Sequence, residues 1–368
     1  MNARQRWLAT MRYESADHWP DEEFGYCEET LQHWQKGGLP EYVGNANADE
    51  FFGFDYKRWA PIRTGVHPSF EYQVLEEHDD RRVVIDTDGC KCVVFSDGAS
   101  SIPKYMKFPI ESRADWNDFK KRLDPETPGR YPADWSALVE EYRKRDYVLG
   151  LEVGSLLGWI RNWMGFENFC YAVADDSAFI EEMVDYLANL ELTVIAKALN
   201  EVEFDVAHFW EDIAFNKGPI VSPAFFKRVL APHYERITQH LNAHGIEFIS
   251  VDCDGNIDDL VPLWLDAGVN VMFPLEQNGG ADPNKFRAEY GQRVLLSGGV
   301  DKTKLIAGGW AIDDELKRLE PLMRQGGFVP HLDHRCPPDV SYENYIYYIE
   351  KKREICGIPQ KAVAGMRA

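Results

Sequence analysis

Apolar and polar residues follow one another along the chain in two patterns that meet near residue 145. Residues 1–145 are irregular, with short helical stretches and Pro-punctuated loops. Within them RRVVIDTDGCKCVVFSDG (81–98) alternates like a β-hairpin that turns at Asp88-Gly89. From 146 to 368 short apolar runs alternate with longer amphipathic stretches. We therefore expect a single domain in which an irregular N-terminal segment precedes regular β/α units.

Six apolar runs in the second part have the length and flanks of buried strands. Each is followed by a stretch of helical periodicity, the longest of them at 166–199. The clearest helix start has Ser222 as N-cap and Pro223 in the first turn, and that helix ends at Gly245. Repeated strand–helix units require parallel strands and right-handed crossovers. The predicted strands are 147–154, 206–213, 246–255, 269–276, 293–301 and 328–334.

Polar groups collect where these strands end, and this decides between an open and a closed sheet. In a closed barrel the loops after all strands meet around one mouth. An open doubly wound sheet would gather them at one switch point, and its Gly-rich phosphate turn is missing from the sequence. The predicted fold is therefore an α/β (β/α)8 TIM barrel with an irregular N-terminal extension. The polar strand ends are Glu152, Glu211, Asp212, Asp252, Asp254, Glu276, Asp301, Asp333 and His334.

Composition narrows the range of partners. A formal charge of −21, from 61 acidic and 40 basic residues, would repel nucleic acid and anionic lipid surfaces. The N-terminus has no apolar stretch of a secretory signal, and no window reaches the roughly 18 apolar residues of a membrane span. We expect a cytoplasmic protein. Its seven cysteines, an odd number, are expected to be free thiols, with Cys90 and Cys92 structural.

The segment SVDCDGN (250–256) carries the clearest chemical signal. Strand alternation places Asp252 and Asp254 on one face, roughly 7 Å apart, and Cys253 on the other. Two carboxylates so placed can share a divalent metal or act as acid and base. The alternative is that Asp254 begins a turn and caps a helix.

A second signal is PHLDHRCPPDV (330–340), in which four groups that bind metal or move protons lie within six residues. His331 and Asp333 share a strand face, and His334 and Cys336 follow in the loop. His331 is a candidate for substrate binding, Asp333 for proton transfer and His334 for metal ligation.

VAHFWEDIAFNKG (206–218) is the third candidate segment, with structural salt bridges as an equal alternative. His208, Trp210 and Asp212 fall on one face; His208 and Asp212 are catalytic candidates, and Trp210 and Lys217 are substrate-binding candidates. Three further residues are candidate substrate contacts at other strand ends, and Arg161 among them would anchor a carboxylate. They are Glu152, Arg161 and Glu276.

Several of these stretches together resemble the uroporphyrinogen decarboxylase superfamily. The likeness is carried by SADHWP, GWIRNWMGFENF, GPIVSPAFFKRVLAPHYERI, VDCDGNIDDLVP, VLLSGGVDK and GGFVPHLDHRCPPDVSYENYIYYIE. The resemblance implies a (β/α)8 barrel with one active-site cleft, in a protein that often forms a homodimer.

The superfamily has two well-defined branches, and the sequence departs from both. True uroporphyrinogen decarboxylases grip a polycarboxylate with an Arg-rich N-terminal loop, whereas the corresponding PDEEFGYCEETLQHWQ (20–35) is acidic. Cobalamin-dependent methyltransferases bind zinc through His-x-Cys-Gly and a later Cys. The matching positions here are Asp252, Asp254 and His334. The resemblance thus implies a metal site with harder ligands than thiolates. In a shifted strand register, Cys253 and Cys336 would join His334 in a softer site.

The expected function is metal-assisted methyl transfer or demethylation of a small neutral or cationic organic substrate. The metal is expected to be zinc, held by Asp252, Asp254 and His334. Any corrinoid would come on a partner protein, since the chain lacks a D-x-H-x-x-G signature. One alternative is a lyase that decarboxylates an acid other than uroporphyrinogen, with Asp254 as proton donor. Another is a non-catalytic barrel that binds a tetrapyrrole or corrinoid.

Overall fold

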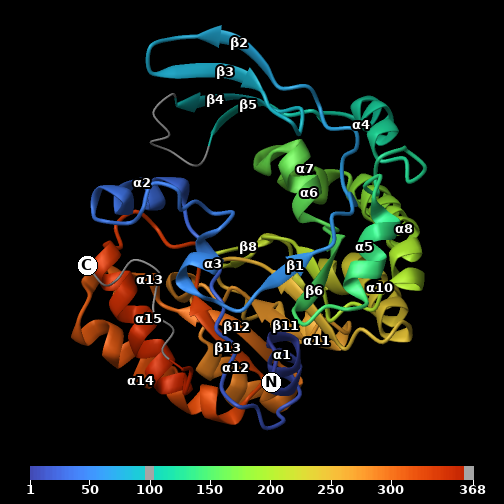
Figure 1. Ribbon diagram of the computed structural model, residues 1–368. Helices are drawn as coiled ribbons and strands as arrows, with labels where there is room; N and C mark the ends of the chain where they lie inside the picture. The colour runs from blue at the N-terminus through green and yellow to red at the C-terminus, as the bar shows by residue number, and fades with distance from the viewer. Residues whose placement is uncertain (96–102, 360–368) are drawn as a thin grey trace.

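The central feature of the computed structural model, which describes residues 1–95 and 103–359, is a parallel sheet of seven strands (Figure 1). All six predicted strands are present and each is shorter than expected: five end before the predicted residue, and β6 begins one residue later. A seventh strand, β1, comes from the segment expected to be irregular. In spatial order the strands are β1 (Lys57–Trp59), β6 (Val148–Gly154), β7 (Val206–Trp210), β10 (Phe248–Asp252), β11 (Val271–Phe273), β12 (Leu295–Val300) and β13 (Phe328–Leu332).

The sheet curls around an apolar cluster at the amino ends of its strands. Six strands each contribute one buried residue to this cluster, and helix α1 (Ala3–Met11) adds Trp7 and Met11. Side chains from β6 round to β13 can meet in one cluster only if the sheet curves about them. The strand residues are Val148, Val206, Phe248, Val271, Leu295 and Val329. Helix α1 therefore closes the bottom of the barrel.

The expectation of eight strands is not confirmed, because the gap between β13 and β1 holds an extended segment instead of a strand. On one side the amide of Asp55, just before β1, donates to Asp21. On the other, Cys27 and Cys336 pair through their backbones, and Glu23 accepts from the amide of Leu332 in β13. Residues 21–27 thus lie between the two edge strands, held by backbone hydrogen bonds at both ends and by the Glu23 side chain.

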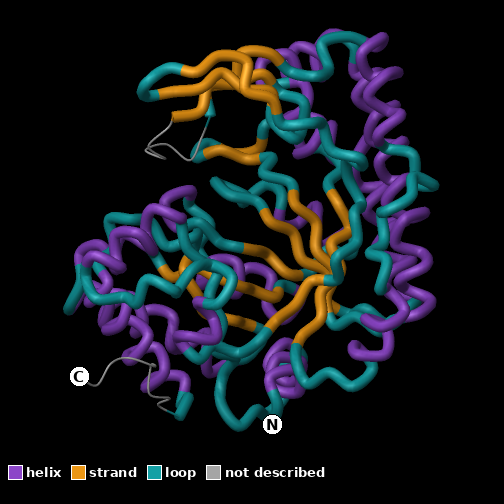
Figure 2. Tube along the Cα trace, turned by 45° about the horizontal axis from the view of Figure 1, so that its top comes forward, coloured by secondary structure: helices purple, strands orange, loops and turns teal. Residues whose placement is uncertain are grey.

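Helices cover the outer face of the sheet (Figure 2). The helix predicted at 166–199 is divided at Asp176, whose extended φ of −140° interrupts the helical backbone. Ser222 caps the next helix through the amide of Phe225, as predicted. The remaining helical segments are α2 (Glu28–Lys36), α3 (Ala48–Phe52), α4 (Arg113–Phe119), η1 (Lys120–Arg122), α5 (Trp135–Tyr142), α6 (Gly158–Met164), α7 (Phe166–Asp175), α8 (Ser177–Glu201), α9 (Pro223–Phe225), η2 (Phe226–Leu230), α10 (Ala231–Ala243), α11 (Val261–Asp266), η3 (Gln277–Gly279), α12 (Pro283–Tyr290), η4 (Gly291–Arg293), α13 (Lys302–Ala307), α14 (Trp310–Gln325) and α15 (Tyr342–Cys356).

A separate antiparallel sheet stands above the barrel (Figure 1). It contains the predicted hairpin, whose strands β3 and β4 pair across a turn with Gly89 at φ +88°; residues 96–98 of that prediction lie outside the described residues. Cys90 and Cys92 are buried, and burial raises the pKa of Cys90 to about 12, which keeps it a thiol. The sheet comprises β2 (Gln73–Glu77), β3 (Arg81–Ile85), β4 (Lys91–Phe95) and β5 (Lys104–Lys107); β8 (Ala214–Phe215) and β9 (Gly218–Pro219) form a further small ribbon.

One extensive core joins residues from Tyr26 to Ile358, so the N-terminal segment and the barrel pack as one body. Within the described part of the chain, none of the helices has both the length and the apolar character needed to cross a membrane.

Candidate active site

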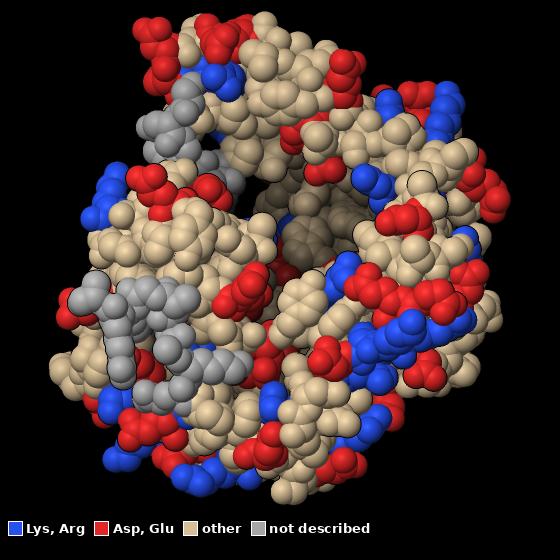
Figure 3. Space-filling model, viewed as in Figure 1, with Lys and Arg blue, Asp and Glu red and all other residues tan. Residues whose placement is uncertain are grey.

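A pocket of about 720 Å³ opens at the carboxyl ends of the barrel strands. Figure 3 shows the corresponding hollow near the centre of the molecule, below the four-stranded sheet. Aromatic rings dominate its apolar wall, with carboxylates and basic groups between them. This size and mixture suit an organic ligand with an apolar body and a few polar groups. The aromatic lining consists of Trp7, Phe24, Trp59, Trp159, Trp210 and Phe273.

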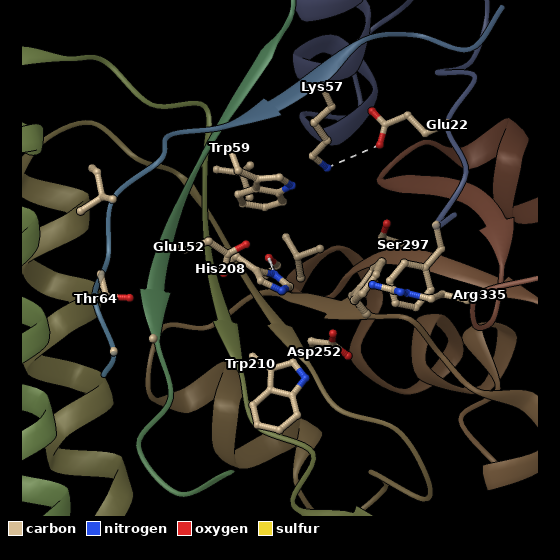
Figure 4. A pocket seen from close by; sticks show the side chains of 18 of the residues that line it. Glu22, Lys57, Trp59, Thr64, Glu152, His208, Trp210, Asp252, Ser297 and Arg335 are labelled. Atoms are coloured by element: carbon tan, nitrogen blue, oxygen red, sulfur yellow. Dashed lines mark hydrogen bonds and ion pairs between the residues drawn. The ribbon is translucent and has the colours of Figure 1, made fainter. Parts of the chain in front are cut away.

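Strand register places the polar pocket residues side by side (Figure 4). Glu152 of β6 is the register partner of His208 of β7, and His208 is that of Ser250 of β10. Two residues further on, Asp252 is paired with Trp210 on one side. Because residues i and i+2 of a strand point to the same face, these side chains form successive layers of the barrel interior.

Close packing seats Trp59 against the floor of this region. A Cβ atom at Gly150, its register partner, would lie 2.2 Å from the indole ring. The indole also lies 5.2 Å from the His208 ring, measured between centroids. Gly150 therefore provides the space in which the indole forms a pocket wall.

His208 is held as a neutral imidazole with one nitrogen available. Ser250 donates its hydroxyl hydrogen to the carbonyl of Ala207, so its oxygen accepts from His208 Nδ1 at 2.7 Å. This fixes the hydrogen on Nδ1 and leaves Nε2 as an acceptor, for which the described residues supply no partner. Burial, followed by the charge of nearby Lys57, lowers the pKa of His208 to about 3. His208 can therefore accept a hydrogen bond at neutral pH.

Glu152 is the titratable group beside it. Burial raises the pKa of Glu152 to about 7, against the opposing effect of Lys57. A carboxyl group with this pKa exchanges its proton near neutral pH, which is the property required of a general acid or base.

His331, in contrast, has both ring nitrogens occupied. Nδ1 donates to the carbonyl of Leu332 at 2.7 Å, and Nε2 then accepts from the Ser297 hydroxyl at 2.9 Å. Burial lowers its pKa to about 3. His331 lines the pocket as a neutral, fully bonded ring.

The acidic N-terminal loop does lie at the pocket, but its charges are largely compensated. Glu22 is 3.5 Å from Lys57, and Glu23 is 2.5 Å from the buried Lys352. Asp21, deeper still, accepts from Arg353 at 2.7 Å. The loop therefore offers no arginine to a polycarboxylate and is fixed in place by its own ion pairs.

A cluster of three carboxylates adjoins the pocket wall. Asp212, Asp252 and Asp254 each have a ligand-type oxygen within 4.8 Å of the others. The backbone builds this arrangement: the amide of Asp212 donates to the carbonyl of Asp252, and Asp212 Oδ1 accepts from the amide of Asp254 at 3.0 Å. Asp212 occupies the left-handed region, at φ +49°, where a non-glycine residue is strained. Asp252 belongs both to the cluster and to the pocket lining.

Among the described residues none of these three carboxylates forms an ion pair with a lysine or arginine. Asp254 Oδ1 is buried with no hydrogen bond, and its Oδ2 lies 3.6 Å from His334 Nε2. Burial, followed by the charge of Asp212, raises the pKa of Asp254 to about 7 and holds that of Asp252 well above its ordinary range. Such a site binds either protons or a cation.

The predicted metal set is thus partly brought together. Asp252 and Asp254 converge as expected, whereas the third carboxylate comes from Asp212, which the sequence had suggested as a catalytic residue. His334 lies beside Asp254 at the edge of the cluster. Cys253 and Cys336 are completely buried, and burial raises both thiol pKa values well above the ordinary value. Neither lies in the three-carboxylate cluster.

Three other candidate site residues form hydrogen bonds or ion pairs within the protein. Asp333 accepts from the amides of Gln277 and Lys302, which ties together the loops after three strands. Glu276 binds the Lys302 ammonium at 3.0 Å. Arg161 donates to the carbonyl of Asp212, so it holds the cluster's backbone and does not line the pocket.

Of the remaining residues predicted to bind substrate, some line the pocket and others do not. Lys217 is exposed and outside the pocket, whereas Trp210 and Glu152 line it. The glycines of SGGVD (297–301) serve close packing: a Cβ atom at Gly298 would lie 1.9 Å from the carbonyl oxygen of Pro274.

Several pocket residues were not predicted. Lys57, Trp59 and Arg63 belong to a three-residue strand and its loop, too short to show alternation. Arg335 lies in HRCPP, between a histidine and a cysteine that carry the stronger metal-binding signal. The signal that could have found it is its place directly after a strand's polar end.

A curled parallel β/α sheet with a polar pocket at the carboxyl ends of its strands defines a barrel enzyme scaffold. The chain belongs to the uroporphyrinogen decarboxylase (URO-D) family, which matches residues 89–355. Its fold is similar to that of a methyltransferase from Methanosarcina mazei, with a TM-score of 0.62 at 16% identity over 96% of this chain and 99% of the other.

A B12-independent methionine synthase from Shewanella sp. W3-18-1, solved with selenomethionine, gives a TM-score of 0.41 at 12% identity, over 78% of this chain and 74% of that one. No curated protein matches the sequence.

Proposed function

We propose that this protein is a metal-assisted methyltransferase or demethylase of a small organic substrate. The observation that carries the proposal is Asp252, a residue without a side-chain hydrogen bond among the described residues that is shared by the pocket wall and the three-carboxylate cluster. A cation there would lie at the edge of the space that holds the substrate. Membership of the URO-D family and the fold shared with a methyltransferase support this choice.

The cluster fits a divalent cation. Metal–oxygen distances of about 2.0–2.6 Å allow two ligand oxygens to lie up to about 5 Å apart, and the three Asp oxygens meet that limit at 4.8 Å. An all-carboxylate set suits Mg²⁺ or Mn²⁺ better than the zinc expected from the resemblance. When bound, the cation would polarise a substrate heteroatom and make its methyl group more electrophilic.

The chain's own residues supply binding and proton transfer. Trp59, Trp159 and Trp210 hold the apolar body of the substrate and exclude water. Loss of a methyl group leaves an electron pair on the heteroatom, and Glu152, with a pKa of about 7, donates the proton that this atom takes up. His208 Nε2 accepts a hydrogen bond from the substrate and so orients it.

The methyl acceptor or donor is a corrinoid on a partner protein in this proposal, as the resemblance implies. A homodimer and a cytoplasmic location also stay predictions.

The test measures metal content and methyl transfer together. Untagged protein is analysed by mass spectrometry after incubation with Mg²⁺, Mn²⁺ or Zn²⁺, in the wild type and in Asp212→Asn and Asp254→Asn. Asp339→Asn, an exposed aspartate in the loop after the last strand, is the control. We expect near-stoichiometric metal in the wild type and control, and loss of both metal and methyl transfer in the two cluster variants. A wild type that binds none of the three ions refutes the metal-assisted mechanism.

One observation favours a second function, decarboxylation. The raised pKa of Asp252 provides a carboxylic acid in the pocket wall, and the charge of nearby Arg335 acts on it. A protonated acid beside a cation can protonate a carbanion after carbon dioxide leaves. Release of carbon dioxide from a carboxylated substrate by metal-free protein would establish this function in place of methyl transfer.

A further inference from the structure

Two arginines at the pocket differ from every other arginine that the structure describes. Within residues 1–95 and 103–359, all arginines except Arg63 and Arg335 use the guanidinium in a hydrogen bond or ion pair. Both exceptions line the same large pocket. Both residues are exposed to solvent, and in a protein with 61 acidic residues neither has an ion-pair partner among the described residues.

The placement of the two residues is set by the fold. Arg63 follows β1, and Arg335 follows β13, the two edge strands that flank the extended segment 21–27. Figure 4 shows Arg335 pointing into the pocket, on the side of Ser297 and Asp252. The loops that carry the two arginines therefore belong to the carboxyl ends of the strands, where a barrel binds its substrate.

Most of the acidic groups at the pocket are engaged elsewhere, and Asp252 is the pocket carboxylate on which the charge of Arg335 acts. Glu22 is paired with Lys57, and Glu23 with Lys352. Glu152, with a pKa of about 7, carries only part of a negative charge at neutral pH. Among the described residues neither Arg63 nor Arg335 has an ion-pair partner, although the formal charge of the protein is −21.

We propose that Arg63 and Arg335 bind an anionic group of the substrate, so that the pocket selects an organic anion with an apolar body. This deepens the proposed function, on which it rests, by naming the class of substrate. It replaces the neutral or cationic substrate expected from the sequence, and it transfers the carboxylate-binding role from Arg161 to these two residues. The planar guanidinium group donates two parallel hydrogen bonds to a carboxylate or phosphate.

The experiment measures binding alone, by quenching of the fluorescence of the pocket tryptophans in protein stripped of metal. The probes are 4-methoxybenzoate, its neutral analogue 4-methoxybenzamide, and phenyl phosphate, which distinguishes a carboxylate site from a phosphate site. The proteins are the wild type, Arg63→Gln, Arg335→Gln and the control Arg293→Gln. Arg293 precedes β12, so the control removes the same charge at the opposite end of the barrel.

We expect the wild type and the control to bind one or both anions at least tenfold more tightly than the amide. Each pocket variant loses about tenfold or more in affinity for the anion and keeps its affinity for the amide. The proposal is overturned if no anion binds the wild type, or if anion and amide bind equally. If one of the two variants binds the anion as tightly as the wild type does, the arginine substituted in that variant does not bind the anion.

This outcome is distinguishable from failure of the proposed function. Anion binding that depends on both arginines, in a protein that binds no metal and transfers no methyl group, would retain the substrate class and refute the reaction.

Discussion

Glu152 should make the protein less stable as the pH rises, the reverse of the usual effect of a carboxylate. Its pKa is about 7 in the folded protein against 4.5 as the reference for the unfolded chain. Between these values the folded state binds more protons than the unfolded state, so stability is fully present below about pH 4.5 and is lost as the pH rises through about 7. The difference corresponds to an upper bound of about 3 kcal/mol.

The perturbation is Glu152→Gln, which keeps the shape of the side chain and removes its titration. Urea unfolding of the wild type and variant is measured between about pH 4.5 and about pH 9. We expect the variant to gain up to about 3 kcal/mol relative to the wild type across this range. Taking the difference between the two proteins cancels the titration of groups that do not interact with Glu152, and the remaining difference includes the effect of the Glu152 charge on Asp252.

Glu71→Gln, at an exposed position, is the matched control and should give a difference that does not vary with pH. A difference for Glu152→Gln that is equally flat would refute the reasoning, because it would mean that Glu152 titrates alike in both states. The role proposed for it as proton donor near neutral pH would then lose its physical basis.

Three further substitutions test the architecture of the site. Gly298→Ala should cost about 3 kcal/mol or more in urea unfolding, because its φ is +107° and the new Cβ meets a backbone carbonyl; unchanged stability would contradict this. Glu211→Ala should cost about 3–5 kcal/mol, because this buried carboxylate accepts from three amides and from Tyr234, and an unfolding midpoint within error of the wild type would exclude that anchoring role. Trp59→Ala should weaken binding of 4-methoxybenzamide severalfold in calorimetry with little loss of stability, and equal affinity would remove the indole from the binding wall.

The order of elements and their direction were determined by the sequence itself. Apolar runs of strand length alternating with amphipathic stretches have one common solution, a parallel sheet covered by helices, and all six predicted strands are present. The convergence of Asp252 and Asp254 was also expected from the sequence, although β10 ends at Asp252 and the amide of Asp254 is held by Asp212 in the segment that follows. Family membership was also predicted, from motifs spread over most of the chain.

Only the tertiary structure shows which residue completes the carboxylate cluster and which basic side chains line the pocket. Asp212 joins Asp254 because its backbone turns into the left-handed region beyond β7, a conformation that no local pattern announces. β1 is three residues long and acquires its place by pairing with β6, so Lys57 and Arg63 carry no periodic signal. The sequence alone does not distinguish the roles of Arg161 and Arg335. Only the fold shows that a backbone carbonyl occupies the first guanidinium, whereas the second lines the pocket without an ion pair or hydrogen bond in the described chain.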